Sequence, residues 1–136
     1  VKQINGRILR EYLEKDAEYW SIDQNQIIVS PKYLYPRPKH YNYDMADGIE
    51  YTITVSNDIG HRITSLTRNG EPITDDMEFT LCISNYRASG GGEFHMIRNT
   101  PTVMELQTSI VELLAIWMMN HQTISFEPVH NITVRR

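Results

Sequence analysis

The chain has 136 residues, of which 40% are hydrophobic and 22% are charged, and its formal net charge is −4. These values are typical of one globular domain with its own core, and they exclude a globally basic surface that would attract nucleic acid or anionic lipid. One cysteine excludes an internal disulfide and a cysteine-rich zinc site. No apolar run approaches the ~20 residues needed to span a bilayer. The chain opens at Val1 with no Met and no signal pattern, so we expect a fragment of a longer protein.

The first third of the chain predicts a helix and a strand, followed by a long irregular segment. Apolar residues recur at helical spacing from Gly6 to Trp20, and Asn5 is a suitable N-cap. A short strand is expected over 26–30. Prolines then interrupt regular structure in 31–48, but four tyrosines argue against disorder, and ordered loops of this length are usually functional. The tyrosines are Tyr33, Tyr35, Tyr41 and Tyr43.

The remainder of the chain predicts strands and a second helix. Apolar and polar residues alternate over 49–55, as a half-buried strand requires. Further strands are expected over 62–67, 78–84, 123–127 and 131–134, with a type I′ hairpin turn at Asn69-Gly70 and a helical turn over 94–97. The segment 103–120 predicts a long helix that is apolar on nearly all sides, and such a helix is normally buried.

These elements do not alternate as regular βαβ units, so the expected fold class is α+β. We expect residues 1–136 to form a single domain in which a mixed sheet packs against a long buried C-terminal helix and an N-terminal helix.

The most informative stretch follows the strand that ends at Ser84. It has the sequence Asn-Tyr-Arg-Ala-Ser-Gly-Gly-Gly-Glu-Phe over residues 85–94. Three consecutive glycines indicate backbone that turns sharply or approaches another group closely, and successive N–H groups in such a turn can form an anion-binding nest. A loop that only connects two elements is the alternative interpretation.

The sequence lacks the usual signs of a catalytic or metal centre. The five histidines fall in no metal-ligand spacing, and the glycine triplet matches no phosphate-binding or nucleophile motif. We therefore expect neither a catalytic centre nor a metal or cofactor site within these 136 residues.

Aromatic rings with polar neighbours point instead to a binding site for a flat ligand. Two rings on either side of a nucleobase form a stacking slot worth roughly 1–3 kcal/mol per base. The candidates are one tyrosine of the 33–43 cluster and Tyr86, with Asn42, Asn85, Arg87 and the Gly90–Gly92 amides as hydrogen-bonding groups around the rim. The alternative is that these tyrosines simply pack on the sheet.

Four segments together resemble the C-terminal substrate-binding domain of the 5′-nucleotidase and 2′,3′-cyclic-nucleotide 2′-phosphodiesterase family. They are residues 4–14, 41–49, 62–66 and 84–94, and the last, Ser-Asn-Tyr-Arg-Ala-Ser-Gly-Gly-Gly-Glu-Phe, is the most specific. The resemblance implies a nucleoside or nucleotide ligand whose base is clamped between Tyr43 and Tyr86. The implied binding residues are Tyr43, Tyr86, Asn85, Arg87, Ser89, Gly90, Gly91 and Gly92.

The same resemblance places hydrolysis elsewhere in the parent protein. It implies an N-terminal metallophosphoesterase domain in cis that holds two divalent metal ions, and an extracellular, periplasmic or cell-wall location. The 5′-nucleotidase branch often has an Asp at the position of Gly92, and the motif here is more similar to that of the cyclic-phosphodiesterase branch. Glu93 is the nearest acid.

A non-enzymatic function is the main alternative. The segment 32–43 mixes tyrosines with Lys32, Arg37, Lys39 and His40, which suits a module that binds single-stranded nucleic acid. The net negative charge disfavours this alternative.

Overall fold

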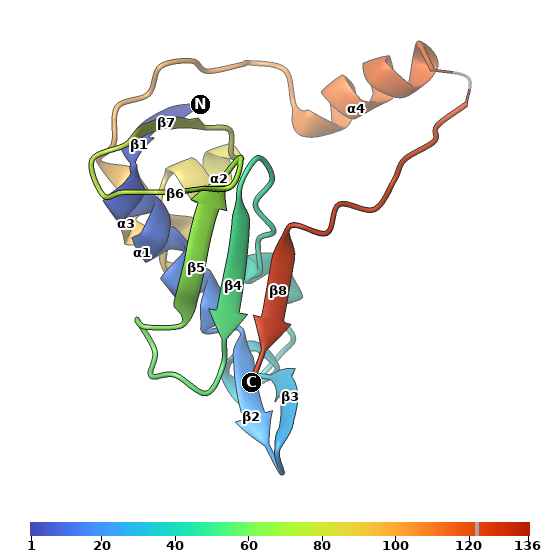
Figure 1. The fold of residues 1–136 in the computed structure, drawn as a ribbon. Coiled ribbons are helices and arrows are strands. Elements are labelled where there is room, and N and C mark those ends of the chain that lie inside the picture. The colour runs from blue at the N-terminus through green and yellow to red at the C-terminus, as the bar shows by residue number, and fades with distance from the viewer. Residues whose placement is uncertain (122) are drawn as a thin grey trace.

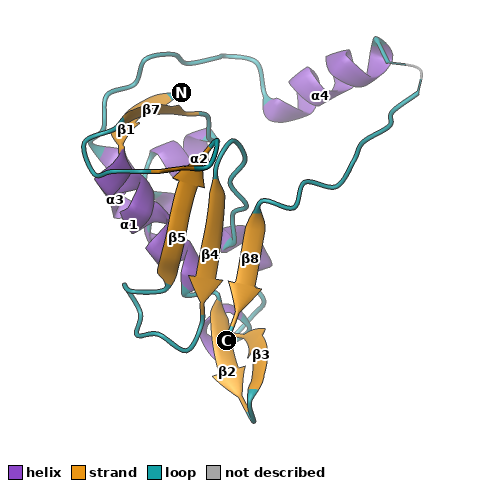
Figure 2. Cartoon of the chain, viewed as in Figure 1, coloured by secondary structure: helices purple, strands orange, loops and turns teal. Residues whose placement is uncertain are grey.

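The computed structural model describes residues 1–121 and 123–136. It confirms the α+β class, with helices and strands arranged as Figures 1 and 2 show. The strands are β1 (Lys2–Asn5), β2 (Trp20–Asp23), β3 (Gln26–Val29), β4 (Glu50–Thr54), β5 (Ile63–Arg68), β6 (Glu71–Pro72), β7 (Glu78–Leu81) and β8 (Ile132–Arg135). The helices are α1 (Gly6–Ala17), α2 (Asn85–Ala88), α3 (His95–Arg98) and α4 (Ile110–Met119), and short 3₁₀ turns occupy η1 (Pro31–Tyr33), η2 (His40–Asn42) and η3 (Gly91–Glu93).

The main sheet has the strand order β6-β5-β4-β8. Strand β4 pairs antiparallel with β5 and parallel with β8, so the sheet is mixed as expected. The turn between β5 and β6 confirms the predicted hairpin, because Asn69 and Gly70 both have positive φ, 54° and 82°, as a type I′ turn requires. Two further pairs, β1–β7 and β2–β3, form small antiparallel sheets of their own.

Helix α1 contributes one buried face to the core. The Asn5 side chain accepts a hydrogen bond from the Ile8 N–H at 3.0 Å, which confirms the predicted cap. The helix ends at Ala17, three residues before the predicted end, because Trp20 begins the β2–β3 hairpin. Its buried face packs with the inner face of the main sheet and with α3 in a cluster that includes Leu9, Leu13, Tyr51, Ile53, Leu66, Phe94 and Ile97.

The C-terminal helix differs from its prediction. Residues 103–109 are not helical, and α4 begins only at Ile110, where Ser109 and Glu112 form a capping box. None of its residues is buried, and Figure 1 shows it projecting from the body of the domain. The prediction of a long buried helix over 103–120 is therefore wrong for the described residues, because no described element covers this apolar helix. The predicted strand over 123–127 is also absent, whereas 131–134 corresponds to β8.

No described helix combines the length and the apolar character that a membrane crossing needs.

Candidate functional site

The motif 85–94 forms a compact turn of helix followed by a glycine loop. The Ser84 hydroxyl accepts a hydrogen bond from the Arg87 N–H at 3.2 Å and so caps α2, which spans Asn85–Ala88. The chain then reverses at Gly90, whose φ is +85°, and continues through η3 into the buried Phe94. The three glycines predict the sharp turn, but nothing in the sequence predicts the helical turn in front of it.

Each of the three positions requires glycine for a different physical reason. Gly90 and Gly92 have φ values of +85° and +71°, which side chains rarely tolerate. Gly91 is needed because a Cβ there would lie 2.6 Å from both the Tyr86 ring and the Tyr86 carbonyl oxygen. A Cβ on Gly92 would lie 2.4 Å from Arg87 Nη1 and 2.7 Å from Asn42 Oδ1. The triplet is thus a tightly packed turn rather than a loose loop.

Arg87 lies inside the domain, with 3% of its surface exposed. Its Nε and Nη2 each donate to one carboxylate oxygen of Asp44 at 2.7 Å, and its Nη1 donates to the Gly91 carbonyl at 2.8 Å. The guanidinium also lies 4.0 Å from the centre of the Phe94 ring, in cation–π geometry. The sequence predicts Arg87 as a hydrogen-bonding residue at the rim of the site. In the structure it is buried beneath the glycine loop, and its hydrogen bonds connect that loop to Asp44.

Asp44 connects this pair to helix α1. The Tyr12 hydroxyl donates to Asp44 Oδ2, and the Asp44 N–H donates to Asp16 Oδ1 at 2.8 Å. Burial raises the pKa of Tyr12 well above its usual value, and the bond to Asp44 adds to that shift. No motif in the sequence assigns Tyr12, Asp16 or Asp44 to the site. Tyr12 and Asp16 lie on α1, 28 or more residues before Asp44, and Asp44 lies 43 residues before Arg87.

Asp16 is the most strongly perturbed carboxyl group. It is 2% exposed, and its Oδ2 has no hydrogen-bond partner among the described residues. Burial raises the pKa of Asp16 to about 8, and the negative charge of Asp44 acts in the same direction, although the Asp44 N–H opposes it. The protonated form of this carboxyl group therefore predominates at neutral pH.

We expect the free energy of unfolding to fall as the pH rises from about 4 to about 8. The Asp16 pKa is raised in the folded state, so the folded state binds the extra proton, and the stability it gives is complete below the unfolded pKa and is lost through the folded pKa. Asp16→Asn should remove this fall. Urea unfolding of both proteins at pH 5, 6, 7 and 8 measures the difference, and parallel pH profiles would contradict the assignment.

The two tyrosines assigned to the base clamp have unequal surroundings. Tyr86 is 50% exposed, and its ring lies against Gly91. Tyr43 is half-buried, and its ring stacks on Tyr19 with centroids 4.5 Å apart and meets Trp20 edge-on at 5.5 Å. Burial raises the pKa of Tyr43. Tyr86 is thus free to meet a ligand, whereas Tyr43 already has one stacking partner within the domain.

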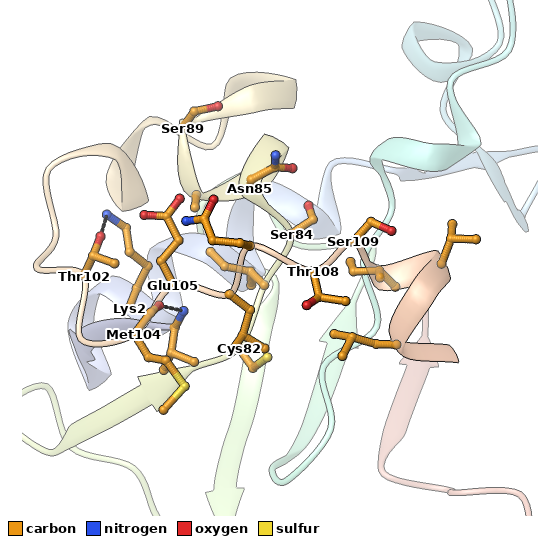
Figure 3. A pocket seen from close by; sticks show the side chains of 18 residues that line it. Lys2, Cys82, Ser84, Asn85, Ser89, Thr102, Met104, Glu105, Thr108 and Ser109 are labelled. Atoms are coloured by element: carbon orange, nitrogen blue, oxygen red, sulfur yellow. Dashed lines mark hydrogen bonds between the residues drawn. The ribbon is translucent and has the colours of Figure 1, made fainter. Parts of the chain in front are cut away.

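The polar residues predicted to form hydrogen bonds with a ligand lie on two sides of α2. Asn85 and Ser89 are exposed and line a hollow of about 920 Å³, together with Ser84, residues 104–111 and Leu113, as Figure 3 shows. Asn85 Oδ1 accepts from the Tyr86 N–H at 2.8 Å, and the Ser89 hydroxyl donates to the Tyr86 carbonyl at 2.8 Å. Asn42 lies on the glycine-loop side, where its Oδ1 is buried without a partner among the described residues.

An ionic cluster fixes the far end of the loop. Glu93, which has a φ of +72°, accepts from Lys15 at 2.7 Å and from Lys32 at 3.1 Å. These two bonds, with that from Lys15 the stronger, lower the pKa of Glu93 to about 2. Glu93 thus links the glycine loop to α1 and η1.

The described residues offer no donor set for a metal. No three His, Cys, Asp or Glu side chains among them lie together in a way that suits an ion. The two divalent ions that the resemblance implies belong, in that expectation, to the N-terminal metallophosphoesterase domain and not to these residues.

Comparison with known proteins decides the family. Residues 1–99 match the family model described as the 5′-nucleotidase, C-terminal domain. The chain belongs to the 5′-nucleotidase C-terminal domain family. The domain is 30% identical to a 2′,3′-cyclic-nucleotide 2′-phosphodiesterase/3′-nucleotidase of Yersinia enterocolitica, over 74% of this chain and 18% of that protein. It is 24% identical to a trifunctional nucleotide phosphoesterase of Bacillus subtilis, over 98% of this chain and 10% of that protein.

Solved structures agree with this assignment. One is a crystal structure whose name gives a 5′-nucleotidase of Staphylococcus aureus in complex with α-ketoglutarate. It superposes on this chain with a TM-score of 0.92 at 31% identity, and the match covers 99% of this chain and 26% of that one. A 5′-nucleotidase precursor from Thermus thermophilus shares the fold, with a TM-score of 0.70 at 15% identity. The domain thus spans about a quarter or less of the length of these relatives.

Proposed function

We propose that the domain binds the nucleoside or nucleotide substrate of a phosphoesterase, with the base stacked on Tyr86. The observation that supports this most directly is the setting of that ring, which is half-exposed on a turn that Gly91 and the Arg87–Asp44 pair hold in place. A rigid, exposed aromatic ring costs little entropy when a flat base stacks on it. The relatives named above are nucleotide phosphoesterases and nucleotidases, which agrees with a ligand of this class.

The second wall of the clamp is proposed to be Tyr43. One face of its ring stacks on Tyr19, so only the remaining exposed part of Tyr43 is available to a base. Asn42, Asn85, Ser89 and the Gly90–Gly92 backbone are proposed to supply hydrogen bonds to the base edge, the sugar or the phosphate. Asn42 lies beside Gly92 on the glycine-loop side of α2.

The parent protein is proposed to be an exported, bifunctional 2′,3′-cyclic-nucleotide 2′-phosphodiesterase/3′-nucleotidase, with a 5′-nucleotidase as the alternative. Hydrolysis would take place in an N-terminal metallophosphoesterase domain in cis. The contribution of this domain would be to bind the base and orient the phosphate ester toward that domain. Identity to the Yersinia enterocolitica enzyme and Gly92 in the motif favour the cyclic-phosphodiesterase branch.

Tyr86→Ala is expected to weaken binding of adenosine 3′-phosphate by roughly 5- to 150-fold, the equivalent of one lost stacking contact of about 1–3 kcal/mol. Tyr86→Phe keeps the ring and should bind within about twofold of the unmodified domain. Tyr35→Ala, which removes a 72% exposed ring elsewhere, is the matched control. Isothermal titration calorimetry measures the affinities of the unmodified domain and the three variants, and equal binding by Tyr86→Ala and Tyr35→Ala would remove Tyr86 from the site.

Exposed aromatic residues in the 32–43 segment keep the nucleic-acid alternative open. Tyr35 and Tyr41 are 72% and 65% exposed and are neighbours of basic residues in sequence. Binding through that segment would involve phosphate contacts, so the affinity for a single-stranded oligonucleotide would fall steeply with salt. Binding of a mononucleotide that changes little with salt supports the proposed function instead.

A further inference from the structure

Helix α4 presents a large apolar surface that nothing in the described part of the chain covers. Its large side chains are 40–83% exposed, namely Ile110, Val111, Leu113, Leu114, Ile116, Trp117, Met118 and Met119. A soluble domain rarely leaves such a contiguous patch in water unless another polypeptide covers it.

The side of α4 nearest the domain opens onto the hollow described above. Ile110, Val111 and Leu113 line it on one side, and Cys82 and Ile83, at the end of β7, line it on the other. Leu113 and Trp117, one helical turn apart, are the least exposed of the large α4 side chains, at 40% and 46%. Met119, near the C-terminal end of the helix, is the most exposed at 83%.

Val1, the first residue of the chain, lines this hollow. The Val1 amino group donates to the Met104 carbonyl at 2.7 Å, the Val103 N–H donates to the Val1 carbonyl at 3.0 Å, and Lys2 pairs antiparallel with Thr102. Figure 3 shows Lys2, Thr102, Met104 and Glu105 side by side at this edge. In an antiparallel register, residues that precede Val1 would run alongside residues 104–106 and toward the start of α4.

We propose that the polypeptide preceding Val1 in the parent protein continues β1 along residues 104–106, fills the part of the hollow between Cys82, Ile83 and Leu113, and covers the Leu113 and Trp117 side of α4. The occupant would be an extended segment with apolar side chains toward the helix. The Staphylococcus aureus structure supports an occupant in cis, because the superposition there includes 99% of this chain within a chain almost four times as long. With this segment in place, the Leu113 and Trp117 side of α4 becomes buried.

Hydrogen exchange in the parent protein and in the 136-residue chain tests the proposal. The amides of residues 110–119 should exchange at least tenfold more slowly in the parent, with the parent monomeric by size-exclusion chromatography. Equal exchange in the two proteins would overturn the proposal. Slow exchange that appears in both proteins only at concentrations where they dimerise would also overturn it, and would assign the surface to a second copy.

Two lysine substitutions in the parent provide a matched pair. Leu113→Lys places a charge in the hollow and should restore fast exchange of 110–119, whereas Met119→Lys adds the same charge at the exposed end and should leave exchange unchanged within about twofold. If the two substitutions change the exchange of residues 110–119 equally, the segment does not cover the Leu113 side of the helix. The comparison of the unmodified proteins does not depend on whether either variant folds.

Discussion

Replacing Arg87 with Met is expected to lower the free energy of unfolding by about 3 kcal/mol, the low end of the range for breaking a buried ion pair. The change removes both hydrogen bonds to Asp44 and the bond to the Gly91 carbonyl, and it leaves the Asp44 carboxylate without its countercharge. The low end applies because the Asp44 side chain is 32% exposed and keeps some contact with water. Urea unfolding followed by circular dichroism measures the loss.

Arg98→Met is the matched control for that prediction. Arg98 is exposed and donates from Nε to the Ser89 carbonyl at 3.2 Å, so it contacts the same loop from outside. Its replacement should cost no more than about 1 kcal/mol. If the two variants lose equal stability, Arg87 does not hold the loop in the way its contacts indicate.

Gly92→Ala is expected to destabilise the domain by about 2–4 kcal/mol and to weaken nucleotide binding by more than tenfold. A positive φ costs a side chain about 1 kcal/mol, and the added methyl group would overlap Arg87 Nη1 and Asn42, with overpacking worth about 1–3 kcal/mol more. Thermal unfolding measures the first effect, and calorimetric titration with adenosine 3′-phosphate measures the second.

Gly48→Ala separates these two contributions. Gly48 has a φ of +79°, close to the +71° of Gly92, but a Cβ there would meet no atom within 4 Å. Gly48→Ala should therefore show only the backbone cost of about 1 kcal/mol and should leave binding unchanged. If Gly48→Ala and Gly92→Ala lower the free energy of unfolding equally, the close contacts around Gly92 add nothing to the cost of its replacement.

Most of the fold was predictable because its signals are local. The Asn5 cap, the alternation over 49–55 and the Asn69-Gly70 turn each depend on neighbouring residues, and the structure confirms all three. The apolar pattern predicts three residues too many for helix α1, because Tyr19 and Trp20 continue it, although their aromatic partners are Tyr33 and Tyr43 in a later segment. The apolar run over 103–120 predicts a helix longer than α4, because the capping box of Ser109 and Glu112, which starts the helix at Ile110, lies inside that run. The segment that we propose to cover α4 lies outside these 136 residues.

The candidate site was predictable in position but only partly in the role of its residues. Three consecutive glycines after a strand indicate a constrained turn, and the structure shows the constraint at each of them. The burial of Arg87 was not predictable, because its partner Asp44 is 43 residues away and Asp16 and Tyr12 are more distant still. No spacing rule connects residues on a helix, a loop and a turn that meet only when the chain folds.

The most direct test of the central claim is an NMR titration of the ¹⁵N-labelled domain with adenosine 3′-phosphate. If the glycine turn presents Tyr86 to a base, the largest shifts should fall on the amides of Tyr86 and Gly90–Gly92, with smaller ones at Asn42 and Tyr43. Saturation with the largest shifts in residues 32–41 and none in the glycine turn would contradict the claim.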